Sequence, residues 1–207
     1  MINLLYCFDS NYNLQAYTSM FSFLNNTDEK LIIHVIHKSD NTSDNFPIKI
    51  TQHEKLEKLK VYKFDSNHTL FPNVENSHVS EATYYRIFFD EYIEDISDID
   101  TLIYIDCDMI CISNPYESIG NNSEKLLLSE FVIGAKTEDF SSNEEDIMFS
   151  NLDLSSGKYL NAGFLIIDVN KWVKRKITSG LTSTIVNLKD KIIYWDQDVF
   201  NSYFDGE

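Results

Sequence analysis

Apolar runs of strand length recur along the chain, and stretches with helical periodicity separate most of them. The runs are Ile2 to Phe8, Leu31 to His37, Val61 to Phe64, Thr101 to Ile105, Phe131 to Gly134 and Gly163 to Val169. Runs of this length are typical of strands that are buried in a sheet. Strands that alternate with helices predict an α/β domain with a largely parallel central sheet.

Several of the intervening segments carry helix signals. In Tyr12 to Asn25 the apolar residues recur at close to 3.6-residue spacing, which predicts an amphipathic helix. A second helix is predicted where Thr51 and Glu54 form a capping-box pattern ahead of Leu56 and Leu59. A third is predicted where Ser80 can cap a run that extends through Tyr92. A fourth is predicted to start near Asn170, and Gly180 would stop or interrupt it. Asp196 to Phe204 has the pattern of a helix entered from a strand.

Two polar stretches, Asp65 to His78 and Ser141 to Gly157, lack periodicity and are predicted to be loops. Long loops in a compact domain often form the rims or lids of functional sites. The chain has three prolines and six glycines, so no linker divides it. We therefore expect one domain over residues 1–207.

The charge balance restricts the class of partner. The chain has 17 Lys and Arg residues and 33 Asp and Glu residues, which gives a formal net charge of -16. A negative charge of this size disfavours binding to nucleic acid. Cys7, Cys107 and Cys111 lie in apolar runs without metal-type spacing, which predicts core residues in a reducing compartment. No apolar run approaches the length of a membrane span or of a signal peptide, so a cytoplasmic protein without an integral membrane segment is expected.

The apolar run from Leu102 to Ile110 is interrupted by two carboxylates one residue apart, Asp106 and Asp108. Ionised carboxylates at the end of a buried strand require a compensating cation or a shared proton. Mg²⁺ or Mn²⁺ bound by one or two carboxylates usually takes its remaining ligands from water and substrate phosphates. The pattern therefore suggests a metal site for nucleotide or phosphate chemistry.

Four other segments place polar groups at the ends of apolar runs or on helices. They are Asp9-Ser10-Asn11-Tyr12, Arg86 within Thr83 to Ile87, Asn161-Ala162-Gly163, and Asp196-Gln197-Asp198. Each has an ordinary alternative: an N-cap at Asp9, a surface ion pair of Arg86 with Asp90, and a tight turn at Gly163. N-capping explains one carboxylate near residue 196 but not the whole group.

Together with Tyr104-Ile105-Asp106-Cys107-Asp108, these segments resemble the family 8 glycosyltransferases in order and spacing. That family includes bacterial lipopolysaccharide galactosyltransferases and glycogenins. The resemblance implies a GT-A (Rossmann-like) nucleotide-sugar-binding domain and retaining transfer of a hexose from UDP-glucose or UDP-galactose. It also implies Mn²⁺ or Mg²⁺ as cofactor and a glycan, lipid-linked glycan or glycoprotein as acceptor.

The resemblance assigns roles to residues. It implies that Asp106 and Asp108 hold the metal at the donor diphosphate, next to Cys107. The uracil and ribose would be lined by Phe8, Asp9, Ser10, Asn11 and Tyr12. The donor sugar would be surrounded by Arg86, Asn161, Ala162, Gly163, Asp196, Gln197 and either Glu138 or Asp139. Gln197 occupies the position debated as a nucleophile, while an ion-pair-like displacement stabilised by Asp196 is at least as plausible chemically.

One departure from the family pattern stands out. The family's C-terminal His motif, which supplies a third metal ligand, has no match after Asn201. A domain lacking its C-terminal segment is therefore expected. Two rival functions remain at this stage: a degenerate module that binds a nucleotide sugar or a partner protein, and a haloacid-dehalogenase-like phosphatase, which also ends a strand in Asp-x-Asp.

Overall fold

The computed structural model describes residues 1–38, 45–65, 71–72, 80–138 and 148–206. Its strands are β1 (Ile2–Phe8), β2 (Leu31–His37), β3 (Leu56–Lys63), β4 (Thr101–Ile105), β5 (Ile133–Thr137) and β6 (Leu160–Asp168). The helices are α1 (Asn13–Asn26), α2 (Ile48–Thr51), α3 (Phe89–Tyr92), α4 (Tyr116–Leu127), α6 (Val169–Arg175), α7 (Ile177–Leu188) and α8 (Trp195–Phe204). Three 3₁₀ helices are described as well, η1 (Ser10–Tyr12), η3 (Glu81–Phe88) and η4 (Ile96–Asp98).

The strands form one six-stranded sheet in the order β3-β2-β1-β4-β6-β5. The pairs β3-β2, β2-β1 and β1-β4 are parallel, whereas β6 is antiparallel to both β4 and β5. The expected α/β fold with a mainly parallel sheet is therefore confirmed. The single reversed strand matters for the site, because β6 begins at the edge of the sheet where β1 and β4 end.

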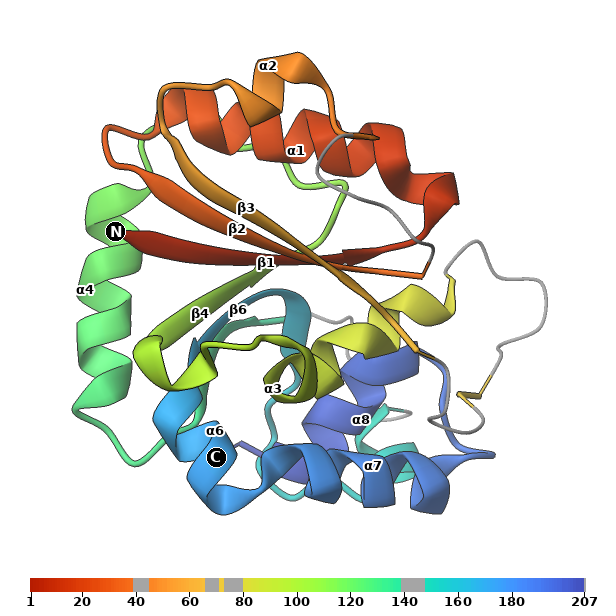
Figure 1. Ribbon diagram of the computed structural model, residues 1–207. Coiled ribbons are helices and arrows are strands. Elements are labelled where there is room, and N and C mark those ends of the chain that lie inside the picture. The colour runs from red at the N-terminus through yellow and green to blue at the C-terminus, as the bar shows by residue number, and fades with distance from the viewer. Residues whose placement is uncertain (39–44, 66–70, 73–79, 139–147, 207) are drawn as a thin grey trace.

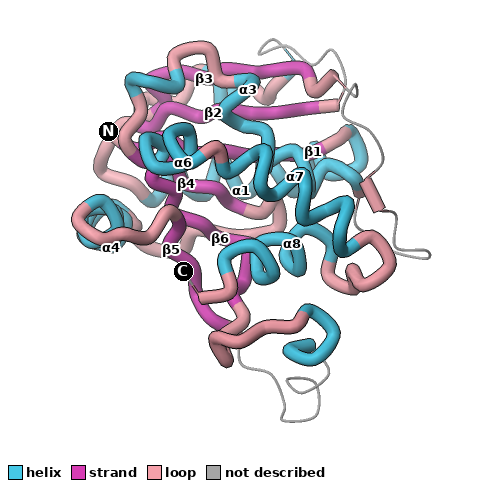
Figure 2. Tube along the Cα trace, turned by 90° about the horizontal axis from the view of Figure 1, so that it is seen from below, coloured by secondary structure: helices cyan, strands magenta, loops and turns pink. Residues whose placement is uncertain are grey.

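Helices cover both faces of the sheet (Figures 1 and 2). Helices α1, α2 and α4 pack on one face, and η3, α3, α6, α7 and α8 pack on the other. Alternate residues of each strand enter the two cores: Leu4 and Tyr6 of β1 belong to one cluster, and Leu5 and Cys7 to the other. This period of two is the normal consequence of strand geometry. Burial on both faces explains why β1 is apolar apart from Asn3.

Several local predictions are confirmed. The predicted bounds of β1, β2 and β4 agree with the structure. The predicted helix beginning at Tyr12 is observed as α1 from Asn13. The Ser80 side chain accepts a hydrogen bond from the backbone N–H of Ala82 and so caps η3, which is a 3₁₀ rather than an α-helix. All three cysteines are free and buried, as expected of core residues.

Other local predictions are wrong. The predicted capping box at Thr51 does not begin a helix, because α2 ends at that residue and Leu56 and Leu59 lie in β3. Pairing with β2 along the whole of β3 outweighs the local helix signal. Residues 189–194 form a turn between α7 and α8, so α8 is not entered from a strand. Helix α4 was not predicted, because glycine and two asparagines interrupt its apolar pattern.

The two predicted loops lie largely outside the described residues. Of the range Asp65 to His78, the structure describes 65 and 71–72, and of the range Ser141 to Gly157 it describes 148–157. Residues 148–152 are helical, contrary to the prediction of a loop. Within the described part of the chain, none of the helices combines the length and the apolar character needed to cross a lipid bilayer.

Gly180 lies inside α7 and does not end it, and its role is in packing. A Cβ at this position would lie 2.3 Å from Cε2 of Tyr203, a residue of α8. The missing side chain therefore allows α7 and α8 to approach each other closely. Gly120, in the interior of α4, has no atom within 4 Å of the equivalent point.

This difference gives opposite expectations for the same substitution. Gly180→Ala is expected to lower the free energy of unfolding by about 1–3 kcal/mol, because the new methyl overlaps the Tyr203 ring. Gly120→Ala is expected to raise it by up to about 1 kcal/mol through helix propensity. Urea unfolding followed by circular dichroism measures both. Equal effects at the two positions would contradict the packing role, as would a failure of Tyr203→Ala to relieve the cost of Gly180→Ala.

Candidate active site

A cavity of about 270 Å³ opens where β1 and β4 end. Among the predicted site residues, those that line it are Phe8, Tyr12, Arg86, Asp106, Cys107, Asp108, Asp196 and Gln197. Residues that line it without having been predicted are Cys7, Ser80, Ala82, Thr83, Tyr104, Tyr194 and Trp195. In open α/β sheets this edge is the usual place for a ligand. Residues from β1, η3, β4 and α8 thus meet at one crevice.

Beyond the end of β1, the chain turns directly into η1. Asp9 is buried, and its Oδ1 accepts a hydrogen bond from the Asn11 backbone N–H at 2.9 Å. Asp9 therefore caps η1, in agreement with the alternative interpretation of this residue as an N-cap. Ser10 and Asn11 are exposed next to this turn. Burial, followed by the charge of Asp108, raises the pKa of the Tyr12 hydroxyl. Tyr12 therefore presents a neutral phenol to the cavity.

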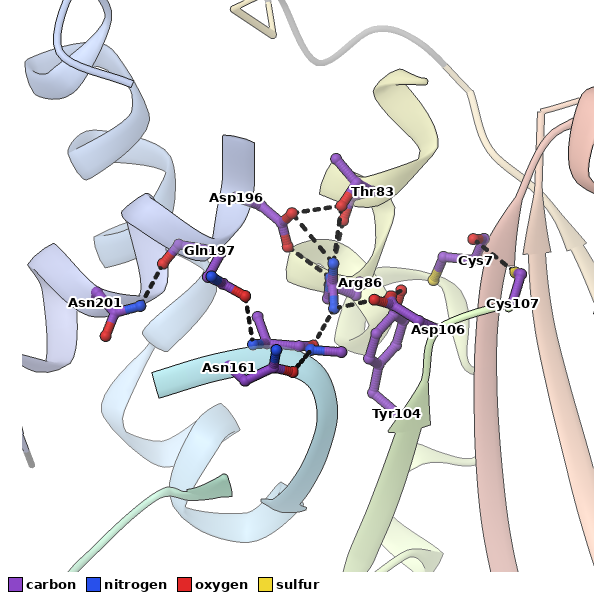
Figure 3. A network of polar contacts seen from close by, with 12 residues as sticks. Cys7, Thr83, Arg86, Tyr104, Asp106, Cys107, Asn161, Asp196, Gln197 and Asn201 are labelled. Atoms are coloured by element: carbon purple, nitrogen blue, oxygen red, sulfur yellow. Dashed lines mark hydrogen bonds and ion pairs between the residues drawn. The ribbon is translucent and has the colours of Figure 1, made fainter. Parts of the chain in front are cut away.

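Arg86 and Asp196 form a buried ion pair at the centre of the site (Figure 3). Their side chains are 4% and 2% exposed, and Arg86 Nε lies 2.6 Å from Asp196 Oδ2. Arg86 Nη2 donates to the other oxygen, Oδ1, at 3.2 Å, and the Thr83 hydroxyl donates to Oδ1 as well. The alternative of a surface ion pair with Asp90 is wrong, because Asp90 instead accepts a hydrogen bond from Thr178.

The Arg86 guanidinium also reaches across to β4 and β6. Its Nη1 donates to the backbone oxygen of Ala162 and lies 3.5 Å from Asp106 Oδ1. Its Cζ sits 3.9 Å from the centre of the Tyr104 ring, the geometry of a cation–π contact. Tyr104 in turn donates its hydroxyl to Asp106 Oδ1 at 2.7 Å. Arg86 and Tyr104 therefore fix the first carboxylate of the Asp-x-Asp pair.

The two carboxylates of the pair face the cavity from the end of β4. The Asp106 side chain is 39% exposed, and Asp108 is exposed. The Asp106 backbone N–H donates to the Gly163 carbonyl at 2.8 Å, which joins the end of β4 to the start of β6. A Cβ on Gly163 would lie 2.8 Å from Asp106 Oδ2, so any larger residue here would force that carboxylate to shift. The tight-turn alternative for Gly163 is wrong, since the residue lies within β6.

The first residues of β6, Asn161 to Gly163, do not line the cavity. They contact Glu138 and Gln197, two other residues predicted to surround the donor sugar. Asn161 Nδ2 donates to Glu138 Oε1 at 2.5 Å, and Asn161 Oδ1 accepts from the Gly163 N–H at 2.8 Å. The Ala162 N–H donates to Gln197 Oε1 at 2.9 Å. Glu138 is thus brought to Asn161, while Asp139 lies outside the described residues.

Burial is the largest cause of the raised pKa values of three groups around the cavity. It raises the pKa of Asp196 to about 6, even though Arg86 and the Thr83 hydroxyl act in the opposite direction. It also raises the pKa of the thiols of Cys7 and Cys107, so both stay neutral. The Cys107 Sγ lies 3.7 Å from the Cys7 carbonyl oxygen, which links β4 to β1. Both cysteines act as small packing residues in the wall of the site.

The residues that sequence reasoning missed have a shared feature. Thr83 and Tyr104 lie within the segments that carry the resemblance, but each acts on another side chain: Thr83 on Asp196, 113 residues away, and Tyr104 on Arg86 and Asp106. Trp195 has φ 47°, a left-handed conformation that is unusual for a bulky residue. No local pattern indicates such a position.

Comparisons with known proteins agree with the fold and the resemblance. The sequence model of the family described as glycosyl transferase family 8 matches residues 3–207. The general stress protein A of Bacillus subtilis (strain 168) is 30% identical over 209 residues, covering 98% of this chain and 68% of that protein. The lipopolysaccharide 1,2-glucosyltransferase of Escherichia coli (strain K12) is 27% identical, covering 99% and 59%. This chain therefore spans roughly three fifths to two thirds of such relatives.

Solved structures give the same fold. The galactosyltransferase LgtC, in complex with donor and acceptor sugar analogues, superposes with a TM-score of 0.78 at 21% identity, covering 98% of this chain and 70% of that one. An active-site mutant of LgtC with glutamate in place of glutamine also gives a TM-score of 0.78 at 21% identity, covering 99% and 71%. The predicted GT-A fold is thereby confirmed.

The raised pKa of Asp196 leads to a pH-dependent stability. The folded protein holds a proton on this carboxyl up to about pH 6, above the ordinary value of 3.8, so the ionised form costs stability at higher pH. The free energy of unfolding of wild type minus that of Asp196→Asn is expected to increase by about 1 kcal/mol from pH 7 to pH 5. Urea titrations of both proteins at each pH measure it. A pH-independent difference would contradict the raised pKa.

Proposed function

The chain belongs to glycosyl transferase family 8, and we propose that its protein is a retaining glycosyltransferase that moves glucose or galactose from a UDP-sugar to a glycan acceptor. The single observation that carries the proposal is the cavity at the ends of β1 and β4. It combines two carboxylates that face the cavity, Asp106 and Asp108, with a buried Arg86–Asp196 pair beside them. Such an arrangement separates a place for a metal-bound diphosphate from a place for a polar sugar.

The donor set of the cavity fits Mn²⁺ or Mg²⁺. Asp106 and Asp108 offer hard carboxylate oxygens, and the glycine at 163 leaves the space that the Asp106 carboxylate fills. Among the described residues, no group of three or more His, Cys, Asp and Glu side chains gathers around one point. Two carboxylates with completion by diphosphate and water match the habit of these ions. When bound, the metal neutralises charge on the leaving UDP.

We assign the nucleoside to the segment after β1. Phe8 and Tyr12 line the cavity, and the exposed Ser10 and Asn11 follow Asp9 in the same turn. An aromatic and polar wall of this kind offers stacking and hydrogen bonds to a base and a ribose. The neutral Tyr12 phenol can both donate and accept.

The sugar is assigned to the wall made by η3, the start of β6 and α8. Asp196 and Gln197 line the cavity and supply acceptor and amide groups that suit sugar hydroxyls. Asn161, Ala162, Gly163 and Glu138 lie in the layer behind them through the contacts of β6. The Arg86 donors are engaged with protein acceptors, so its role is to hold Asp196 and Asp106 in place.

Retention of configuration requires either a nucleophile on the protein or departure and attack on the same face of the sugar. The Gln197 Oε1 already accepts a hydrogen bond from Ala162, and an amide is a weak nucleophile. We therefore favour the same-face displacement, in which Asp196 stabilises the positive charge that develops on the sugar. Partial protonation of Asp196 near pH 6 would weaken that stabilisation.

The proposed acceptor class rests on the relatives alone. One relative is named for lipopolysaccharide, and LgtC is a galactosyltransferase solved with donor and acceptor sugar analogues. A glycan, lipid-linked glycan or glycoprotein is the acceptor that we propose here. We treat residues 1–207 as one domain of the glycosyltransferase. The haloacid-dehalogenase alternative has no support from the family match, and a degenerate binding module becomes an outcome of the first experiment.

Metal-dependent nucleotide binding is the first test. UDP titrated by calorimetry is expected to bind with Mn²⁺ and to bind at least about tenfold more weakly in EDTA or after Asp106→Asn/Asp108→Asn. The chain offers a matched control, Asp98→Asn/Asp100→Asn, an exposed Asp-x-Asp pair before β4 at the opposite edge of the sheet. UDP binding without UDP-sugar turnover would favour the degenerate module, and no binding in either condition would contradict the proposed donor site.

The space at Gly163 gives a second test of the same site. Gly163→Ala is expected to weaken Mn²⁺-dependent UDP binding about tenfold, because the new methyl would lie 2.8 Å from Asp106 Oδ2. Gly134→Ala in β5 is the control, since its Cβ would meet the side chain of Ile166 at an ordinary 3.8 Å. Calorimetry of the two variants measures the difference. Equal affinities would show that Asp106 does not need this space to bind the metal.

A further inference from the structure

Asp198 completes the Asp196-Gln197-Asp198 group, and the proposed function gives it no role. Its side chain is 0% exposed, and it does not line the cavity. Oδ1 accepts a hydrogen bond from the Tyr159 hydroxyl, while Oδ2 accepts from the backbone N–H groups of Ile193 and Tyr194 at 2.6 and 2.8 Å. Both oxygens are therefore occupied by the protein, and the carboxylate is not available to a ligand.

The donors that bind the Asp198 carboxylate all precede α8 in the chain, and two of them belong to the turn just before the helix. The cap residue of α8, Tyr194, makes no side-chain capping hydrogen bond, so the turn before the helix is held from inside the helix by Asp198. The turn ends at Trp195, whose φ of 47° costs about 1–2 kcal/mol for a residue with a side chain. Strained backbone of this kind persists only where surrounding contacts enforce it. Asp198 supplies those contacts.

The same face of α8 is fixed to the beginning of β6. Asn201 Oδ1 accepts from the Leu160 N–H at 2.6 Å, and Asn201 Nδ2 donates to the Leu160 carbonyl at 2.9 Å. Gln197 Oε1 accepts from the Ala162 N–H, and Asp198 binds the hydroxyl of Tyr159. The helix is thus held in one register along β6, and residue 196 follows directly from the strained Trp195.

We infer that Asp198 is a positioning residue that holds the left-handed turn at Trp195 and thereby presents Asp196 and Gln197 to the donor sugar. The inference rests on the proposed function for its effect on turnover, whereas the effect on Trp195 is independent of it. Without the carboxylate, the backbone N–H groups of Ile193 and Tyr194 lose their shared acceptor, Asp198 Oδ2, and the φ of Trp195 is free to relax. Asp196 and Gln197 would then move relative to the cavity, with UDP contacts on β1 and β4 unaffected.

The chain contains a built-in reporter of this turn. Its two tryptophans are Trp172, which is 0% exposed in the core, and Trp195, which is partly exposed at the cavity. Acrylamide quenching of the intrinsic fluorescence therefore reports mainly on Trp195. We expect the quenching constant to rise in Asp198→Ala and, to a smaller degree, in Tyr159→Phe, which removes one hydroxyl and keeps the ring.

Steady-state kinetics with a UDP-sugar separate positioning from loss of fold. Asp198→Ala is expected to lower kcat about tenfold to a hundredfold, because small displacements of groups around the reacting centre are costly. Calorimetric affinity for UDP with Mn²⁺ should be unchanged. Asp198→Asn should restore most of kcat and of the wild-type quenching, since its amide oxygen can still accept from Ile193 and Tyr194.

Asp205→Ala is the matched control for Asp198→Ala. Asp205 also accepts backbone hydrogen bonds, from Ser155 and Ser156 at 3.0 and 3.1 Å, but it lies at the far end of α8. Unchanged Trp195 quenching in a folded Asp198→Ala, or an equal rise in Asp205→Ala, would overturn the inference. If Asp198→Ala does not fold, unchanged quenching in Tyr159→Phe does the same. Absence of turnover in wild type would count against the proposed function, and the quenching result would still decide the role of Asp198.

Discussion

The buried ion pair between Arg86 and Asp196 is the interaction on which the site depends. Two charges at 4% and 2% exposure carry a large desolvation cost, which is offset only when their remaining donors and acceptors are also satisfied. Thr83 and the Ala162 carbonyl provide most of those partners, whereas Asp196 Oδ2 has no hydrogen-bond partner and is held by its ion-pair contact with Arg86 Nε. Because the partners come from η3, β6 and α8, satisfying the pair forces these three elements to converge. The position of α8 over the sheet edge is therefore decided by electrostatics as much as by its apolar face.

The reversed direction of β6 explains how so many polar groups reach one crevice. In a purely parallel sheet, only the residues after each strand would lie at this edge. Here Ile105 of β4 pairs with Phe164 of β6, so the first residues of β6 lie beside the Asp-x-Asp pair. The backbone of Gly163 and the side chain of Asn161 are thereby placed next to Asp106 and Glu138. Topology, more than local sequence, brings the metal-side and sugar-side groups together.

The site consists of residues that face the cavity and residues that hold them. Asp106, Asp108 and Gln197 face it, and Arg86 and Tyr104, which also line it, hold the carboxylate of Asp106 in place. Preorganisation of this kind keeps the polar groups in place before a ligand arrives, which is the condition for effective electrostatic stabilisation.

The sequence by itself determined the fold class, the bounds of β1 and β4, and the Asp-x-Asp pair, because strand burial and strand-end polarity are local patterns. It misread β3, whose helix-like start is overridden by pairing with β2. Only the tertiary structure decided that Arg86 pairs with Asp196, 110 residues away, rather than with Asp90. It likewise decided the left-handed backbone of Trp195. Both depend on which distant groups satisfy buried charge and backbone, and that is a property of the assembled chain rather than of any segment.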